Sequence, residues 1–123
     1  MVFLYGPRPV HPHARRVCIP KSLAVEFGMS AGSHVRVELS SRSDSELAIR
    51  PASPPTAAQG RRDIRRPRLV NAGGQVTLPA SLLEQVGVSP QHPLVFFVAD
   101  DTRAEVRIIP ARQVSFSGGS PRE

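Results

Sequence analysis

The stretch that decides the fold is residues 17–23, with the sequence VCIPKSL, which returns 59 residues later as VTLPASL in residues 76–82. The match continues without a gap, and ten of the 36 positions from 17 to 52 are identical to the position 59 residues further on. Most of the other positions keep their apolar character. Self-similarity at a fixed spacing is the signature of a repeated structural unit. The chain is therefore predicted to be a tandem duplication, with one unit in residues 9–52 and the second in residues 68–111.

Each unit is predicted to fold as β-β-α-β-β with one short helix. In the first unit, an extended stretch at 9–12 precedes a strand at 16–19, a helix at 21–27, and a hairpin of strands at 35–39 and 46–50. The second unit repeats these elements at 68–72, 75–78, 80–86, 94–98 and 105–109. Three kinds of boundary residue support the assignment. They are proline at the first helical position (Pro20, Pro79), glycine in the left-handed position after the helix (Gly28, Gly87) and proline after the hairpin (Pro51, Pro110).

The strand at 94–98 (LVFFV) is apolar on both faces, whereas its counterpart at 35–39 (VRVEL) alternates between apolar and charged residues. We therefore expect the second strand to be buried more deeply than the first. At a spacing of 59, Phe96 corresponds to Val37 and is expected to face the core. The remaining segments are a Pro-, Ala- and Arg-rich linker at 53–67 and a tail at 112–123, which is predicted to be flexible.

The charge is distributed unevenly along the chain. There are 16 Lys and Arg against 10 Asp and Glu, which gives a net charge of +6. Residues 1–68 carry twelve basic and five acidic side chains, a net +7, and residues 69–123 carry four and five, a net −1. All but one of the basic residues are arginine, whose guanidinium binds phosphate through two parallel hydrogen bonds. The first half therefore favours a polyanionic partner, and the alternative is a basic face that is merely solvated.

Several other classes of protein do not fit the sequence. No apolar run is long enough to span a bilayer, and a single cysteine, Cys18, rules out an internal disulfide, so we expect a soluble cytoplasmic protein. The G-x-S-x-G motif at 28–32 leads from helix to strand, the reverse of a nucleophile elbow, and is interpreted as a turn. His11, His13 and Cys18 lack a fourth metal ligand at a suitable spacing. We expect no enzyme activity, no cofactor and no metal.

The pattern Val-x-[Ile/Leu]-Pro-x-x-Leu, followed by glycine, a turn and a Val-rich hairpin, resembles the AbrB/MazE/SpoVT swapped-hairpin domain family. Two copies in one chain are similar to the MraZ arrangement, and the resemblance covers residues 9–52 and 68–111. It implies a mainly β fold, a swapped-hairpin (double-split) β-barrel made of two half-barrels. The barrel would close within one chain, as a pseudo-dimer, or between chains, as a homo-oligomer. Members of this family are mostly DNA-binding transcription regulators or the DNA-binding half of antitoxins.

The family pattern Gly-Arg-Val-x-Ile-Pro-Lys is matched unevenly. The first unit has Arg15 where glycine is usual and then matches the pattern at Arg16, Val17, Ile19, Pro20 and Lys21. The second unit matches the glycine at Gly74 but has Gln75 and Ala80 in place of arginine and lysine. A first-strand arginine, common in DNA-binding members, is matched by Arg68 and falls on Pro9 in the first unit. The helix positions that carry paired arginines in such members are Ala24, Val25, Leu83 and Glu84 here.

These departures place the predicted DNA contacts on the strand arginines and the linker. Arg15, Arg16 and Lys21 lie around one strand-to-helix corner, and Lys21 stands in the first helical turn, where backbone N–H groups favour a phosphate. The residues predicted to contact DNA are His13, Arg15, Arg16, Lys21, Arg61, Arg62, Arg65, Arg66, Arg68, Gln75 and Thr77. The sequence thus predicts a nucleoid-associated regulator of transcription that binds double-stranded DNA. The alternative is an antitoxin-type or adaptor protein whose main ligand is a protein, such as a toxin or a regulator.

Overall fold

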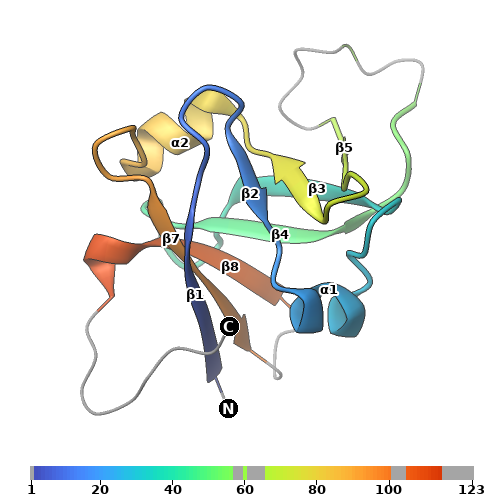
Figure 1. Ribbon diagram of the computed structural model, residues 1–123, viewed down its shortest axis with the longest axis horizontal. Coiled ribbons are helices and arrows are strands. Elements are labelled where there is room, and N and C mark those ends of the chain that lie inside the picture. The colour runs from blue at the N-terminus through green and yellow to red at the C-terminus, as the bar shows by residue number, and fades with distance from the viewer. Residues whose placement is uncertain (1, 57–59, 61–65, 101–104, 115–123) are drawn as a thin grey trace.

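The protein is mainly β, with antiparallel strands and two short helices, as the sequence predicted (Figure 1). The computed structural model describes residues 2–56, 60, 66–100 and 105–114, and of Val2 and Asp100 it describes only the backbone. The strands are β1 (Val2–Pro9), β2 (Arg16–Cys18), β3 (His34–Leu39), β4 (Leu47–Ala52), β5 (Arg68–Leu69), β6 (Gln75–Thr77), β7 (Leu94–Asp100) and β8 (Glu105–Pro110). The helices are α1 (Lys21–Phe27) and α2 (Ala80–Val86), and a 3₁₀ turn, η1 (Ala111–Gln113), follows β8.

Six of the strands form one antiparallel sheet in the order β1-β7-β8-β4-β3-β5, and β2 and β6 form a separate two-stranded ribbon. The ribbon lies on the side of the molecule that faces the viewer in Figure 1. Strands from before the linker pair with strands from after it: β1 with β7, β2 with β6, β3 with β5 and β4 with β8. The two parts of the chain therefore build the sheet and the ribbon jointly.

Both helices have the predicted bounds and end in the predicted way. Gly28 and Gly87 adopt left-handed backbone angles, with φ of 71° and 83°, and the N–H of each donates back to the last turn of its helix. The prediction for Pro20 and Pro79 is wrong by one position, since each precedes its helix as the N-cap with an extended ψ near 130°. Proline suits this position because its fixed φ of about −65° is compatible with an extended backbone. Neither helix is long and apolar enough to cross a membrane, which holds for the part of the chain that the structure describes.

The N-terminal strand is the main element that the sequence did not indicate. An extended stretch was predicted at 9–12, but the strand is β1, at Val2–Pro9, and residues 12–14 belong to a turn. The hairpins also extend further than predicted, because β4 continues through Pro51 and β8 includes Pro110. The Ser40 N–H donates to Glu46, so the alternation of the ladder places Pro51 in a non-hydrogen-bonded pair with Val35. A proline is tolerated there because β3 does not use its missing N–H.

The core lies between the sheet, the ribbon and the helices. On β3 the core residues are Val35 and Val37, and on β7 they are Val95 and Phe97, which are at most 2% exposed. These pairs are 60 residues apart rather than 59, so the predicted register of β7 is wrong by one residue. Phe96 is buried at 3% exposure, as expected for a strand apolar on both faces, but it is not part of the core cluster.

Candidate nucleic-acid interface

The ribbon of β2 and β6 carries four of its six side chains on its outer face. Val17 and Val76 lie opposite each other in the middle of the ribbon and are both 1% exposed, so they face the core. Because side chains alternate along a strand, the flanking residues point outward. These are two cross-strand pairs, Arg16 opposite Thr77 and Cys18 opposite Gln75. The ribbon therefore presents one guanidinium, one carboxamide, one hydroxyl and one thiol together.

The backbone continues the ribbon in the same way at both ends. The Ile19 N–H donates to the Gly74 carbonyl at 3.0 Å, and the Leu78 N–H donates to the Arg15 carbonyl at 2.8 Å. Arg15 and Gly74 thus hold matching positions, and both have left-handed backbone angles, with φ of 53° and 75°. Such a conformation costs roughly 1–2 kcal/mol for a residue with a Cβ and nothing for glycine. Arg15 therefore occupies a strained position that glycine fills on the other strand.

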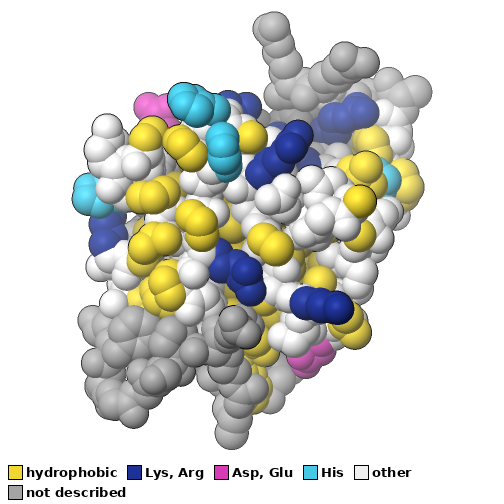
Figure 2. Space-filling model, in the orientation of Figure 1, with side chains coloured by type: hydrophobic (Ala, Val, Ile, Leu, Met, Phe, Trp, Pro, Cys, Tyr) yellow, Lys and Arg dark blue, Asp and Glu magenta, His cyan; other side chains and the backbone are white. Residues whose placement is uncertain are grey.

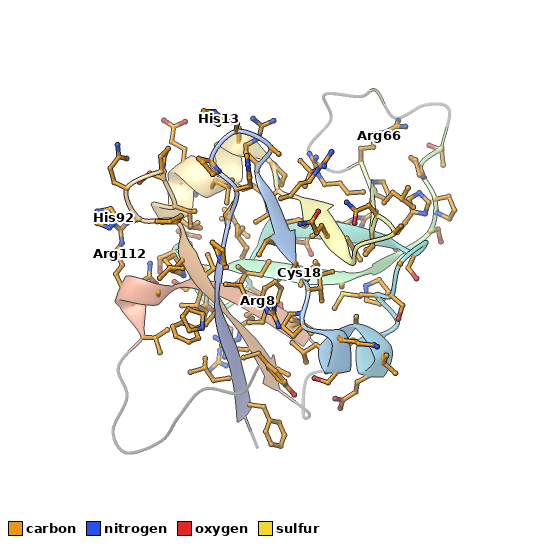
Figure 3. The ribbon with its side chains drawn as sticks, viewed as in Figure 1. Arg8, His13, Cys18, Arg66, His92 and Arg112 are labelled. Atoms are coloured by element: carbon orange, nitrogen blue, oxygen red, sulfur yellow. The ribbon has the colours of Figure 1, made fainter. Side chains whose placement is uncertain are left out.

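A polar side chain organises the turn that precedes each ribbon strand. Before β2, the Nδ1 atom of His11 accepts hydrogen bonds from the N–H groups of His13 and Ala14, at 3.2 and 3.0 Å. Before β6, the Oδ1 atom of Asn71 accepts from the N–H groups of Gly73 and Gln75, at 3.0 and 2.9 Å. His13 itself is exposed at the tip of its turn (Figure 3), with its ring edge-on to that of His11 at 6.1 Å.

Two arginines on the outer strands flank the ribbon. Arg8 on β1 lies opposite Val95, and Arg68 on β5 lies opposite Val35, so each shares a face of the sheet with a fully buried valine. The Nε atoms of both arginines are buried and have no hydrogen-bond partner in the structure. Burial lowers the pKa of Arg68 below its ordinary value, and the positive charge of Arg15 lowers it further. Both guanidinium groups are therefore poorly compensated.

Sequence reasoning missed Arg8, because the constant spacing of 59 places Arg68 on Pro9. The strand registers instead relate Arg68 to Arg8, at a spacing of 60. The signal was present in the sequence: Arg-Pro-Val at 8–10 is followed by Arg-Leu-Val at 68–70.

Each side of the ribbon opens into a hollow of about 410 Å³. One hollow is lined by Arg8 together with Arg16, Cys18 and Gln75, and Figure 3 shows Arg8 and Cys18 on the adjacent strands β1 and β2. The other is lined by His34, Arg66, Arg68 and Thr77. Each hollow thus has a flanking arginine on one wall and the outward face of the ribbon on another.

The predicted basic corner of Arg15, Arg16 and Lys21 is not a single patch. Arg15 lies beside α2, where it lines a hollow of about 380 Å³ with Ala80 and Glu84. Lys21 is exposed at the start of α1, at the opposite end of β2. The extended backbone of β2 separates the two, and Arg15 is instead near enough to Arg68 to influence its ionisation. The structure therefore groups the predicted residues around the ribbon. Arg61, Arg62 and Arg65 lie outside the described residues.

Basic side chains are spread over the face of the molecule that carries the ribbon, and acidic side chains are visible only at its margins (Figure 2). Among the described residues, no group of three or more His, Cys, Asp or Glu side chains is placed to hold a metal ion. The thiol of Cys18 makes only long contacts, of 3.8 and 3.9 Å, with the carbonyls of Ile19 and Gly73. The chemistry of the site is that of hydrogen-bond donors and positive charge, which suits an anionic ligand.

Comparison of the chain with protein-family models, with curated proteins and with solved structures found no match.

Proposed function

We propose that the protein is a regulator of transcription that binds double-stranded DNA through the outer face of the β2–β6 ribbon. The observation that carries the proposal is the pair of half-buried arginines, Arg8 and Arg68, on the two sides of the ribbon. A buried donor without a partner costs about 1–3 kcal/mol, and a phosphate oxygen would remove that cost. An arginine can also bind a phosphate through two parallel hydrogen bonds, which fixes its geometry.

The ribbon between these arginines supplies groups that suit the edges of bases. The major groove of DNA is wide enough to admit a two-stranded β-ribbon, and arginine and glutamine are side chains that recognise bases there. Contacts to the phosphates from Arg8 and Arg68 would set the position of the ribbon, and Arg16 and Gln75 would then reach the bases.

The proposal includes the architecture implied by the AbrB/MazE/SpoVT resemblance, a swapped-hairpin barrel of two tandem repeats closed within one chain. The crossed pairing of β1 with β7 and of β5 with β3 supports it, as do the matching hydrogen bonds at the two ends of the ribbon. We further propose that the protein acts in the cytoplasm, on the nucleoid, and that it catalyses no reaction.

The salt dependence of binding tests this function. Affinity for a pool of random-sequence duplexes is measured by fluorescence anisotropy at several salt concentrations. For Arg8→Ala/Arg68→Ala, the slope of log K against log salt should fall by about 1.8, because each lost phosphate contact removes about 0.9. The matched control is Arg36→Ala/Arg42→Ala, which removes the same charge from exposed positions in the first hairpin. Equal losses in the two variants would contradict the assignment of the contacts.

One observation favours the alternative function, an antitoxin-type or adaptor protein. The hollow beside α2 has an apolar floor of Val10, Leu83 and Val88, each at most 8% exposed, and could receive an apolar side chain of a partner protein. The exposed Ala80 lies at its edge, so Ala80→Arg should block that partner and leave the ribbon intact. The alternative is supported if the product of a neighbouring reading frame forms a complex that Ala80→Arg abolishes, while no duplex is bound.

A further inference from the structure

The ribbon has a backbone that is nearly symmetric and side chains that are not. Val17 and Val76 form its central pair, so exchanging the two strands places Arg16 on Gln75 and Cys18 on Thr77. The hydrogen bonds at the two ends obey the same exchange. The two halves of the ribbon therefore present different chemical groups from equivalent positions.

The groups that suit the DNA backbone are the same in both halves. Arg8 and Arg68 stand opposite equivalent valines, have the same unpartnered Nε atom and line hollows of about the same volume. Contacts from these two residues would set the position of the protein on DNA, but they would not distinguish one half of a binding site from the other.

The groups that suit base edges differ between the halves. Arg16 is exposed and its guanidinium makes no hydrogen bond or ion pair with the residues that the structure describes. Gln75 is half-buried, and its Oε1 atom accepts a hydrogen bond from the Nδ2 of Asn71 at 3.3 Å, which orients the carboxamide. The Nε2 group and the second lone pair of Oε1 remain available to a ligand.

These side chains match different bases. Arginine pairs best with O6 and N7 of guanine, and glutamine pairs with N6 and N7 of adenine. Building on the proposed DNA-binding function, we infer that the protein recognises a directional, non-palindromic duplex. The half-site under Arg16 contains guanine at the contacted position, and the half-site under Gln75 contains adenine. The protein then binds its site in one orientation only.

Selection from a pool of random-sequence duplexes tests the inference with the full-length protein. The wild type should enrich a non-palindromic motif and prefer it over either palindromic version by about 5- to 150-fold, the value of one bidentate base contact. Arg16→Gln should change guanine to adenine at one position and so make the two contacted positions symmetric. Gln75→Arg should change adenine to guanine at the other position. Arg42→Gln, which removes an exposed charge from the first hairpin, should leave the motif unchanged.

The outcomes separate this inference from the function on which it rests. A palindromic motif for the wild type, or the same motif for Arg16→Gln as for the wild type, would overturn the inference and leave DNA binding intact. If no duplex of any sequence is retained, both the inference and the proposed function are wrong. Arg16 is exposed, so its substitution tests the inference even if Gln75→Arg proves unstable in a thermal melt followed by circular dichroism.

Discussion

Replacing Arg15 by glycine should raise the stability of the protein and weaken its binding to DNA. Arg15 has a φ of 53°, and the left-handed conformation costs roughly 1–2 kcal/mol for a residue with a Cβ. Glycine removes that cost but increases the freedom of the unfolded chain, which offsets about 0.4–1 kcal/mol of the gain. We expect Arg15→Gly to raise the free energy of unfolding by about 0.5–1 kcal/mol and the melting temperature by about 2–5 °C.

Two further variants separate the backbone from the charge. Arg15→Ala removes the charge but keeps a Cβ, so it should not become more stable. Gly74→Ala introduces the same strain at the matching position, and since its new Cβ would meet no atom within 4 Å, it should lose about 1 kcal/mol from the backbone alone. Urea unfolding followed by circular dichroism gives these values, and DNA titrations should show a salt slope lowered by about 0.9 for both Arg15 variants. If Arg15→Gly is less stable than Arg15→Ala, the explanation from backbone strain is wrong.

Two other predictions concern the fold. Phe97→Ala should cost about 3–5 kcal/mol in a urea titration, because the ring is fully buried between Tyr5 on β1 and Ile108 on β8. Leu94→Ala, at a 42% exposed position of the same strand, should cost less than about 1 kcal/mol, and similar values for the two would refute the register. Residues 1–56 and 60–123, expressed separately, should each be unfolded or self-associate and should regain structure when mixed. A folded, monomeric 1–56 in sedimentation and circular dichroism experiments would contradict the proposal of two interlocked repeats.

Helix positions and the general order of strands could be predicted from the sequence because proline and glycine mark their ends. The registers could not, since a constant spacing hides one-residue shifts that cancel. In the structure, Val35 corresponds to Val95, whereas Pro51 still corresponds to Pro110. The second part of the chain thus has one more residue before β7 and one fewer in the turn after it. Strand β1 was missed because its pairing partner, β7, lies about 90 residues away along the chain.

The candidate site was predicted in part. The sequence identified Arg16, Gln75, Thr77 and Arg68, which the structure places on the ribbon or beside it. It treated Lys21 as a neighbour of Arg15, because residues close in sequence need not be close in space when an extended strand separates them. Arg8 required the pairing of β1 with β7, which no local pattern contains. Contacts between distant parts of the chain therefore decide which arginines gather around the ribbon.

The ribbon is assembled from two strands of the same chain, and this has a thermodynamic consequence. If the two halves were separate molecules, the ribbon would form only above their dissociation constant and would be lost on dilution. A covalent connection makes the encounter intramolecular, with an effective concentration on the order of millimolar for a short linker. The binding surface should therefore persist when only a few molecules are present in a cell. Each half can also change its sequence without having to remain compatible with an identical copy of itself.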